Sequence, residues 1–229
     1  MKTIGLIGGM SWESTVEYYR LINEEVNKRL GGLHSAKSLQ VSVDFAEIEY
    51  YQKTDNWEKA AQVLSDAAQS LEKGGADFII ICTNTMHKVF DNIQESITVP
   101  MIHIADATAD EIKAKGLHKV GLLGTIYTME QDFYKSRFEQ AGIEIIIPEK
   151  KDREIVNRII FEELCLGKIL ESSRDEYRRI ILELEAQGAQ GMVLGCTEIG
   201  LLIKQAAYKI PLFDTAYIHS IKAVDTALS

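Results

Sequence analysis

The chain has 229 residues, of which 46% are hydrophobic and 26% are charged, a composition typical of a folded globular protein. Its formal net charge of −9 argues against a nucleic-acid partner, because phosphate groups favour clustered Lys and Arg side chains. No apolar run is long enough to span a bilayer, and the first residues lead directly into a strand rather than form a signal peptide.

Strand-like and helix-like segments alternate through the first half of the chain. Residues 3–7 form an apolar run that ends at Gly8-Gly9, and residues 12–30 then show helical periodicity. Residues 57–73 are helical as well, and the glycines that follow them are a typical helix stop. The elements predicted for this half are strands 3–7, 39–45, 78–82 and 100–104 and helices 12–30, 57–73, 85–93 and 105–115.

The second half repeats this order. Residues 188–198 align without a gap on residues 75–85 at a constant spacing of 113 residues, and the alignment pairs Thr83 with Cys196. Each run has a Gly-Ala turn, an apolar strand and then small polar residues. The elements predicted here are strands 119–123, 143–147, 191–195 and 210–213, helices 129–141, 152–167 and 173–187, a short helix from about 198 and a last helix.

The alternation predicts an α/β fold with parallel sheets covered by helices. The repeat predicts two similar, pseudo-duplicated domains, each a parallel sheet flanked by helices, with the active site at the domain interface. We place the first α/β domain at residues 1–97 together with 209–229, and the second at residues 98–208.

Four polar segments follow predicted strands, at the position where open α/β sheets bind ligands. Each is nearly free of charge and precedes a helix N-terminus, whose free N–H groups suit a carboxylate or another anion. These segments are residues 8–11, 83–85, 125–128 and 196–198.

The three cysteines differ in context. Cys196 stands at a helix N-terminus, where we expect its pKa to be lowered so that it acts as a thiolate; the alternative is a small buried hydrophobe. Cys82 aligns with Gly195 and closes an apolar strand, so we interpret it as structural. Cys165 fits core packing and a pocket wall equally well. Their odd number and wide spacing favour reduced thiols and a cytoplasmic location over disulfides.

His87 is the one histidine inside a polar motif. It lies one helical turn after Thr83, and we expect it to orient the loop rather than to act as a base. No His, Cys or carboxylate pair has the spacing of a zinc site, and neither Gly-rich segment matches the dinucleotide fingerprint. The sequence therefore predicts no metal and no nucleotide cofactor.

Three motifs together resemble those of the aspartate/glutamate racemase family. They are residues 8–15 (Gly-Gly-Met-Ser-Trp-Glu-Ser-Thr), residues 84–87 (Asn-Thr-Met-His) and residues 195–198 (Gly-Cys-Thr-Glu). The resemblance covers essentially the whole chain and is greatest to the bacterial broad-range or L-aspartate/L-glutamate type. It implies two α/β domains with the site between them, no pyridoxal phosphate, no metal, a homodimer and a small amino-acid substrate.

The resemblance also implies two acid/base residues on opposite faces of the substrate Cα. In most members both are cysteines, but here Thr83 stands at the first position and Cys196 at the second. A thiol has a pKa of about 8.5 and a hydroxyl is close to water at about 15.7, so thiolate formation is easier by about 10 kcal/mol. We therefore predict that Cys196 is the main base and that one reaction direction is favoured.

Further site residues follow from the resemblance and from their place after the strands. The α-carboxylate and the enediolate would be held by Asn84, Thr85 and Thr197, and Glu198 would receive the α-ammonium group or orient Cys196. Gln52 is neutral where aspartate-specific members have a basic residue, so a wider substrate range is expected. The rest of the pocket would be lined by Met10, Ser11, Thr125 and Thr128.

Two other functions fit the same residues. One effective cysteine opposite a threonine also suits an isomerase or decarboxylase of small dicarboxylates on this fold. A duplicated α/β protein could instead bind an amino acid without turning it over, although a pure binding module has no use for an activated cysteine.

Overall fold

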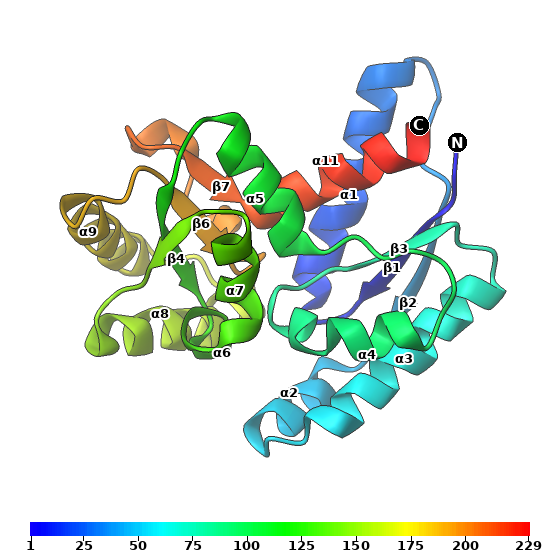
Figure 1. Ribbon diagram of the computed structural model, residues 1–229, viewed down its shortest axis with the longest axis horizontal. Helices are drawn as coiled ribbons and strands as arrows, with labels where there is room; N and C mark the ends of the chain where they lie inside the picture. The colour runs from blue at the N-terminus through cyan, green and yellow to red at the C-terminus, as the bar shows by residue number, and fades with distance from the viewer. The chain divides into compact units, whose positions relative to one another are not determined.

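The structure is a computed structural model that describes all 229 residues, and the chain divides into two compact units (Figure 1). Unit 1 comprises Met1–Ile104 and His219–Ser229, and unit 2 comprises Ala105–Ile218. Each unit contains one parallel sheet flanked by helices, which confirms the predicted fold class. The unit boundaries lie several residues after those placed from the sequence at 97/98 and 208/209.

Unit 1 is built on a three-stranded parallel sheet of order β2-β1-β3. Its last strand, β3, reads Phe-Ile-Ile-Ile and is fully buried, as expected of a strand covered on both faces. Its elements are β1 (Ile4–Gly8), α1 (Trp12–Leu30), β2 (Ser38–Ser42), α2 (Phe45–Lys53), α3 (Trp57–Lys73), β3 (Phe78–Ile81), the 3₁₀ turn η1 (Thr85–Val89) and α4 (Phe90–Glu95).

The strand predicted at residues 100–104 is reduced to a single bridge between Ile79 and Met101. Two hydrogen bonds hold it to β3: the Ile79 N–H donates to the Pro100 carbonyl at 3.0 Å, and the Ile102 N–H donates to the Ile79 carbonyl at 3.2 Å. The segment therefore extends the sheet at the β3 edge for only three residues before the chain turns into the next helix.

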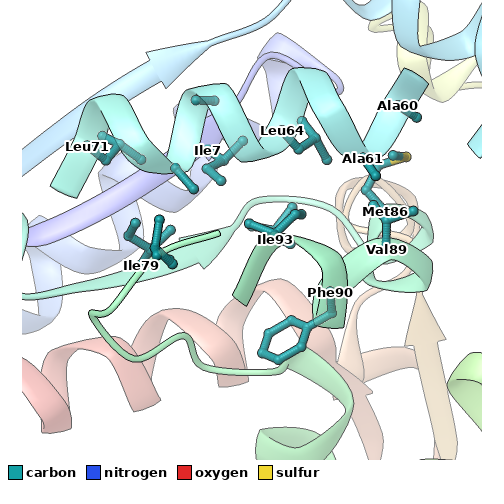
Figure 2. Close-up of a cluster of buried hydrophobic side chains, with 14 of the residues drawn as sticks. Ile7, Ala60, Ala61, Leu64, Leu71, Ile79, Met86, Val89, Phe90 and Ile93 are labelled. Atoms are coloured by element: carbon teal, nitrogen blue, oxygen red, sulfur yellow. The ribbon is translucent and has the colours of Figure 1, made fainter. Parts of the chain in front are cut away.

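Helix α3 covers one face of this sheet because its apolar residues recur at helical spacing. It begins after Asn56, whose side chain accepts a hydrogen bond from the Lys59 N–H, and it ends before Gly74. Figure 2 shows Leu64 and Leu71 among the buried side chains that α3 packs against Ile79 of β3 and against α4. Alternate strand residues such as Ile80 are buried outside this cluster, as the period of two in a strand requires.

Unit 2 has a four-stranded parallel sheet of order β5-β4-β6-β7. Its elements are α5 (Ile104–Ala114), which begins at the last residue of unit 1, β4 (Lys119–Gly124), α6 (Ile126–Glu130), α7 (Asp132–Gln140), β5 (Glu144–Ile146), α8 (Lys150–Glu162), the 3₁₀ turn η2 (Leu164–Leu166), α9 (Glu171–Ala186), β6 (Met192–Gly195), α10 (Ile199–Leu202), the 3₁₀ turn η3 (Gln205–Ala207), β7 (Leu212–Asp214) and α11 (Thr215–Leu228), which returns the chain to unit 1.

The internal repeat is visible in the pairing of the strands. The order β2-β1-β3 followed by the bridge at Met101 corresponds to β5-β4-β6-β7. Even the bonds at the two prolines correspond, because the Met192 N–H donates to the Pro211 carbonyl at 2.9 Å as the Ile79 N–H does to Pro100. Each unit therefore places the same two neighbouring strands, β1 and β3 or β4 and β6, at its centre.

The sequence-based elements also miss a helix in unit 1. The alternation over residues 39–45 predicts one strand, and no helix is predicted between that strand and residue 57, where α2 lies. In the structure β2 ends at Ser42, and Asp44 caps α2 by accepting a hydrogen bond from the Ala46 N–H at 3.1 Å. None of the helices combines the length and the apolar character that crossing a bilayer would need.

We expect truncation of Leu64, which is fully buried in the α3 core, to destabilise the protein strongly. Leu64→Ala should lower the free energy of unfolding by about 2–5 kcal/mol, because it leaves a cavity in a packed core. Leu182→Ala, on an exposed position of α9, is the matched control and should change it by no more than about 0.5 kcal/mol. Urea titration followed by circular dichroism measures both, and equal effects would contradict this account of the core.

Candidate functional site

In unit 1 the two central strands bring two polar segments to the same edge of the sheet. β1 and β3 are parallel and directly paired, so the segment 8–11 after β1 and the segment 83–85 after β3 leave the sheet side by side. A side-chain bond joins them, since the Ser14 hydroxyl in the first turn of α1 donates to the Cys82 carbonyl at 2.8 Å. This edge is therefore a fixed polar surface.

The segment after β1 is held by a glycine and a threonine. Gly9 has φ of +94°, and a Cβ at this position would lie 2.2 Å from the Val43 carbonyl oxygen, so only glycine fits without strain. Its N–H donates to the Thr15 hydroxyl at 2.8 Å, and that hydroxyl donates to the Ser11 carbonyl at 2.8 Å. Met10 and Ser11 are buried in this arrangement, and Ser11 caps α1.

Thr83 is the partly exposed member of its segment, whereas Asn84 and Thr85 are buried. The Thr83 carbonyl is bonded to Nδ1 of His87 at 2.8 Å. Burial is the main cause that holds the pKa of His87 well below its usual value, followed by the neighbouring His103 and His219. A role for His87 as a base is therefore disfavoured, and the loop-orienting interpretation fits its contacts.

Cys82 lies at the end of β3 with no exposed surface. Its N–H continues the ladder by donating to the Ile7 carbonyl at 2.9 Å. Burial raises the pKa of its thiol far above the ordinary value, so Cys82 stays a neutral thiol at physiological pH. This agrees with the structural interpretation that the repeat gave it.

Gln52 and Met86 meet in unit 1. Gln52, on α2, is buried, and its amide nitrogen lies 3.1 Å from the sulfur of Met86 on η1. Gln52 thus lies beside the 84–87 motif, on a helix that the sequence did not predict.

In unit 2 the strand pairing places Thr125 and Cys196 at one edge. Gly124 of β4 and Gly195 of β6 are directly paired, and Thr125 and Cys196 directly follow the ends of these strands. A Cβ at Gly195 would lie 2.7 Å from Leu122 and 3.0 Å from the Leu123 carbonyl oxygen, so the close approach of the two strands requires glycine there.

Thr125 and Thr128 form the cap of α6. The Thr125 hydroxyl accepts a hydrogen bond from the Thr128 N–H at 3.3 Å, and the two hydroxyl oxygens are 3.2 Å apart. Both residues are buried. The helix begins at Ile126, three residues earlier than predicted, because this cap was not recognised in the sequence.

Cys196, Thr197 and Glu198 form a hydrogen-bonded cluster. The Cys196 thiol and the Thr197 hydroxyl both donate to Oε2 of Glu198, each at 2.9 Å. All three side chains are buried, with Cys196 8% exposed and Glu198 2% exposed. The sequence-predicted residues of the 196–198 segment are thus brought into direct contact.

The expected lowering of the Cys196 pKa is wrong for this arrangement. Burial raises the pKa of the thiol well above its ordinary value, and the negative charge of Glu198 is the next cause. The helix that follows, α10, spans four residues, so its N-terminus offers little compensation. Cys196 is therefore a neutral thiol whose proton points at a carboxylate.

Sequence reasoning missed two tyrosines beside the thiol. Burial raises the pKa of Tyr134 and of Tyr177, and Cys196 lies near enough to raise both further when it is ionised. Cys165 contributes to the Tyr177 shift and also raises the pKa of Cys196, which places it near the cluster. No local signal could have shown this, because α7, α9 and η2 are far from residue 196 in the sequence.

The predicted site residues are distributed over both units. Those of unit 1 are Met10, Ser11, Gln52, Thr83, Asn84 and Thr85, and those of unit 2 are Thr125, Thr128, Cys196, Thr197 and Glu198. No group of three or more His, Cys, Asp or Glu side chains in the chain is arranged to hold a metal ion.

This chain is similar in sequence and structure to proteins of one known family. The model of the Asp/Glu/Hydantoin racemase family matches residues 7–222. A solved structure from Yersinia pestis, described as that of a candidate Asp/Glu racemase, is 59% identical, covers 100% of both chains and superposes with a TM-score of 0.93. An aspartate racemase homologue from Pyrococcus horikoshii is 39% identical, covers 100% of both chains and has a TM-score of 0.86.

A curated relative is similar over its whole length. The broad specificity amino-acid racemase RacX of Bacillus subtilis is 24% identical over 229 residues, which is 99% of this chain and 98% of that protein. The aspartate racemase of Picrophilus torridus, 22% identical with a TM-score of 0.83 and covering 99% of this chain and 94% of its own, shares the fold.

The geometry around Cys196 predicts how its reactivity depends on pH. Because burial and Glu198 both raise the thiol pKa, alkylation by iodoacetamide should rise only at a pH above the ordinary thiol range. Glu198→Gln removes the negative charge and should move this rise to lower pH.

Mass spectrometry can follow alkylation at each cysteine separately, in a Cys165→Ser background. Fully buried Cys82 is the internal control and should stay unmodified while the protein is folded. A rise at unchanged or higher pH in Glu198→Gln would contradict the role of the carboxylate.

Proposed function

The chain belongs to the Asp/Glu/hydantoin racemase family, and from that premise we propose that it is a cofactor-independent amino-acid racemase that acts on aspartate, glutamate or a broader range of amino acids. The single observation that carries the proposal is the buried cluster in which the Cys196 thiol donates to Glu198. A thiol with a carboxylate at 2.9 Å has a partner for its proton, as a base for Cα chemistry needs.

The reaction requires two groups in opposite protonation states. One removes the Cα proton of the substrate, and the other returns a proton to the opposite face. We assign the first role to Cys196 and the second to Thr83, because the internal repeat and the family motif put these two residues at equivalent positions. We propose that their side chains act on opposite faces of Cα.

Substrate binding itself would activate Cys196. In the unliganded protein the Glu198 charge disfavours a thiolate. An α-ammonium group bound to Glu198 would neutralise that charge, so the thiol pKa would fall only when an amino acid is present. Glu198→Gln should consequently slow racemisation even though it makes the free thiol easier to ionise.

Removal of the Cα proton turns the α-carboxylate into an enediolate, which is stabilised by hydrogen-bond donors that are already positioned before the reaction. Asn84, Thr85 and Thr197 are buried at the carboxyl ends of β3 and β6, next to the backbone N–H groups of short helices. We propose that they bind the α-carboxylate. Met10, Ser11, Thr125 and Thr128 would line the remaining wall.

The proposed substrate range rests on Gln52. Its buried amide is neutral and contacts Met86, so it offers no charge that would demand an acidic substrate side chain. This agrees with a range wider than aspartate, as in the broad specificity relative from Bacillus subtilis.

Thr83 makes the proposed reaction asymmetric. Its hydroxyl is harder to ionise than a thiol by about 10 kcal/mol, so Thr83 holds a proton that it can give to Cα, and solvent water reprotonates the alkoxide that this leaves. To remove a proton, Thr83 would first have to become that alkoxide. We therefore propose that Cys196 abstracts the proton readily from one enantiomer and that abstraction from the other enantiomer, by Thr83, is slow. A homodimer and a cytoplasmic location stay predictions; light scattering of the purified protein tests the first.

Deuterium exchange tests the proposal directly. The protein is incubated with L- or D-amino acids in D₂O, and mass spectrometry measures deuterium at Cα. Cys196→Ser should lower exchange by about 10³-fold, and Thr83→Ala should lower it by about 10-fold or more for one enantiomer, since these are typical contributions of acid/base groups. Cys82→Ser is the matched cysteine control and should exchange at nearly the wild-type rate.

Two outcomes would contradict the proposal. An inactive Cys82→Ser beside a fully active Thr83→Ala would show that the register assigned from the repeat is wrong. Turnover of maleate or malonate derivatives without amino-acid exchange would favour the single-cysteine isomerase or decarboxylase instead, to which Thr83 at the first position is also suited.

A further inference from the structure

His87 makes two hydrogen bonds that together define its protonation state. Its Nδ1 lies 2.8 Å from the Thr83 carbonyl oxygen, and its Nε2 lies 3.2 Å from the backbone nitrogen of Ile104. A backbone N–H can only donate, so Nε2 must carry a lone pair. Nδ1 therefore carries the proton and donates it to Thr83. His87 is a neutral ring with one fixed tautomer.

A second histidine fixes the same segment of backbone. Nε2 of His219 lies 3.0 Å from the Ile102 carbonyl oxygen, which can only accept, so Nε2 carries the proton. Nδ1 of His219 then accepts from the hydroxyl of Tyr18 at 2.9 Å. Residues 102–104 are thus held at one end by His219 and at the other by His87.

These bonds close a ring of contacts around the turn that carries Thr83. The Ile102 N–H donates to the Ile79 carbonyl of β3, and β3 leads into Thr83. From Thr83 the ring continues through His87 to Ile104 and back to Ile102. The turn is therefore braced against a segment that its own strand already holds, and His87 is the only side chain in this ring.

The surroundings of His87 leave it little freedom to move. The residue is 3% exposed, and its ring packs against His103 at 4.5 Å and against Phe90 at 5.8 Å, measured between ring centroids. Both ring nitrogens already have partners, so His87 cannot take a proton without losing the bond to Ile104. It is placed to hold a neighbour and not to exchange protons.

We propose that His87 is the positioning residue for Thr83: through the Nδ1–H bond to the Thr83 carbonyl it fixes the turn that presents the Thr83 hydroxyl to the substrate. This rests on the proposed function, in which Thr83 acts on one face of Cα. The loss of His87 should therefore affect the exchange of one enantiomer more than that of the other.

The test compares Cα deuterium exchange of both enantiomers in three variants. The enantiomer that depends on Thr83 is identified as the one more affected by Thr83→Ala. His87→Phe keeps a buried ring but removes both bonds, and it should lower exchange of that enantiomer by about five- to tenfold relative to the other, the size expected for one hydrogen bond. His87→Asn keeps an N–H donor near the position of Nδ1 and should restore most of the ratio.

Leu71→Ala is the control for a loss of stability in unit 1, since Leu71 is buried in the α3 core cluster and its side chain makes none of the hydrogen bonds in the ring. It should lower the Tm and leave the ratio of the two exchange rates unchanged. A ratio that is unchanged in His87→Phe, or that falls equally in His87→Phe and His87→Asn, would overturn the positioning role.

The outcomes separate this role from the proposed function. If Thr83→Ala shifts the ratio and His87→Phe does not, only the role of His87 fails. If wild-type protein exchanges neither enantiomer, the proposed function fails and the positioning role fails with it. Long-range ¹H–¹⁵N NMR of labelled histidines adds a readout without substrate, in which an Nε2–H tautomer of His87 would contradict the proposal.

Discussion

The pairing of two neighbouring parallel strands in each unit determines where the chemistry lies. β1 and β3 in unit 1, and β4 and β6 in unit 2, end at one edge because parallel strands in register end together. The residues that directly follow two paired strands are therefore adjacent to one another. In unit 2 this requires Gly195, where a side chain would collide with the neighbouring strand. The cluster around Cys196 depends on that close approach.

Much of the fold could be predicted because periodicity and stop signals coincide. Helices α1 and α3 have the predicted bounds, since each has a capped start, an apolar stripe and glycine after its end. Helix α2 was missed because it is short and follows a strand whose alternation continues up to Phe45. Residues 100–104 look like a strand by composition, but the chain enters α5 at Ile104, so only a single bridge forms.

The motifs in the sequence locate the candidate site, but they do not predict the protonation state of its cysteine. The sequence places Cys196 before a helix and so suggests a low pKa, but the sign depends on how deeply the thiol is buried and on the direction of the Glu198 carboxylate. Neither is encoded in spacing. Tyr177 lies beside the thiol only because α9 packs in the same unit, and a single sequence without a structure cannot reveal such long-range neighbours.

The two units have equivalent strand orders, but the polar segments that follow their central strands differ in charge. In the proposed reaction, that difference decides which segment would attract the ammonium group of the substrate. The segment after β3 carries hydroxyl and amide groups and is held by the neutral His87, so no carboxylate stands in it. The equivalent segment after β6 has Glu198 at the position of Thr85. An amino acid carries an ammonium group, which a carboxylate such as Glu198 would attract. In the proposed reaction, the same carboxylate that disfavours a thiolate in the free protein would be neutralised by an amino acid, and not by a simple dicarboxylate, so that only an amino acid would lower the pKa of Cys196.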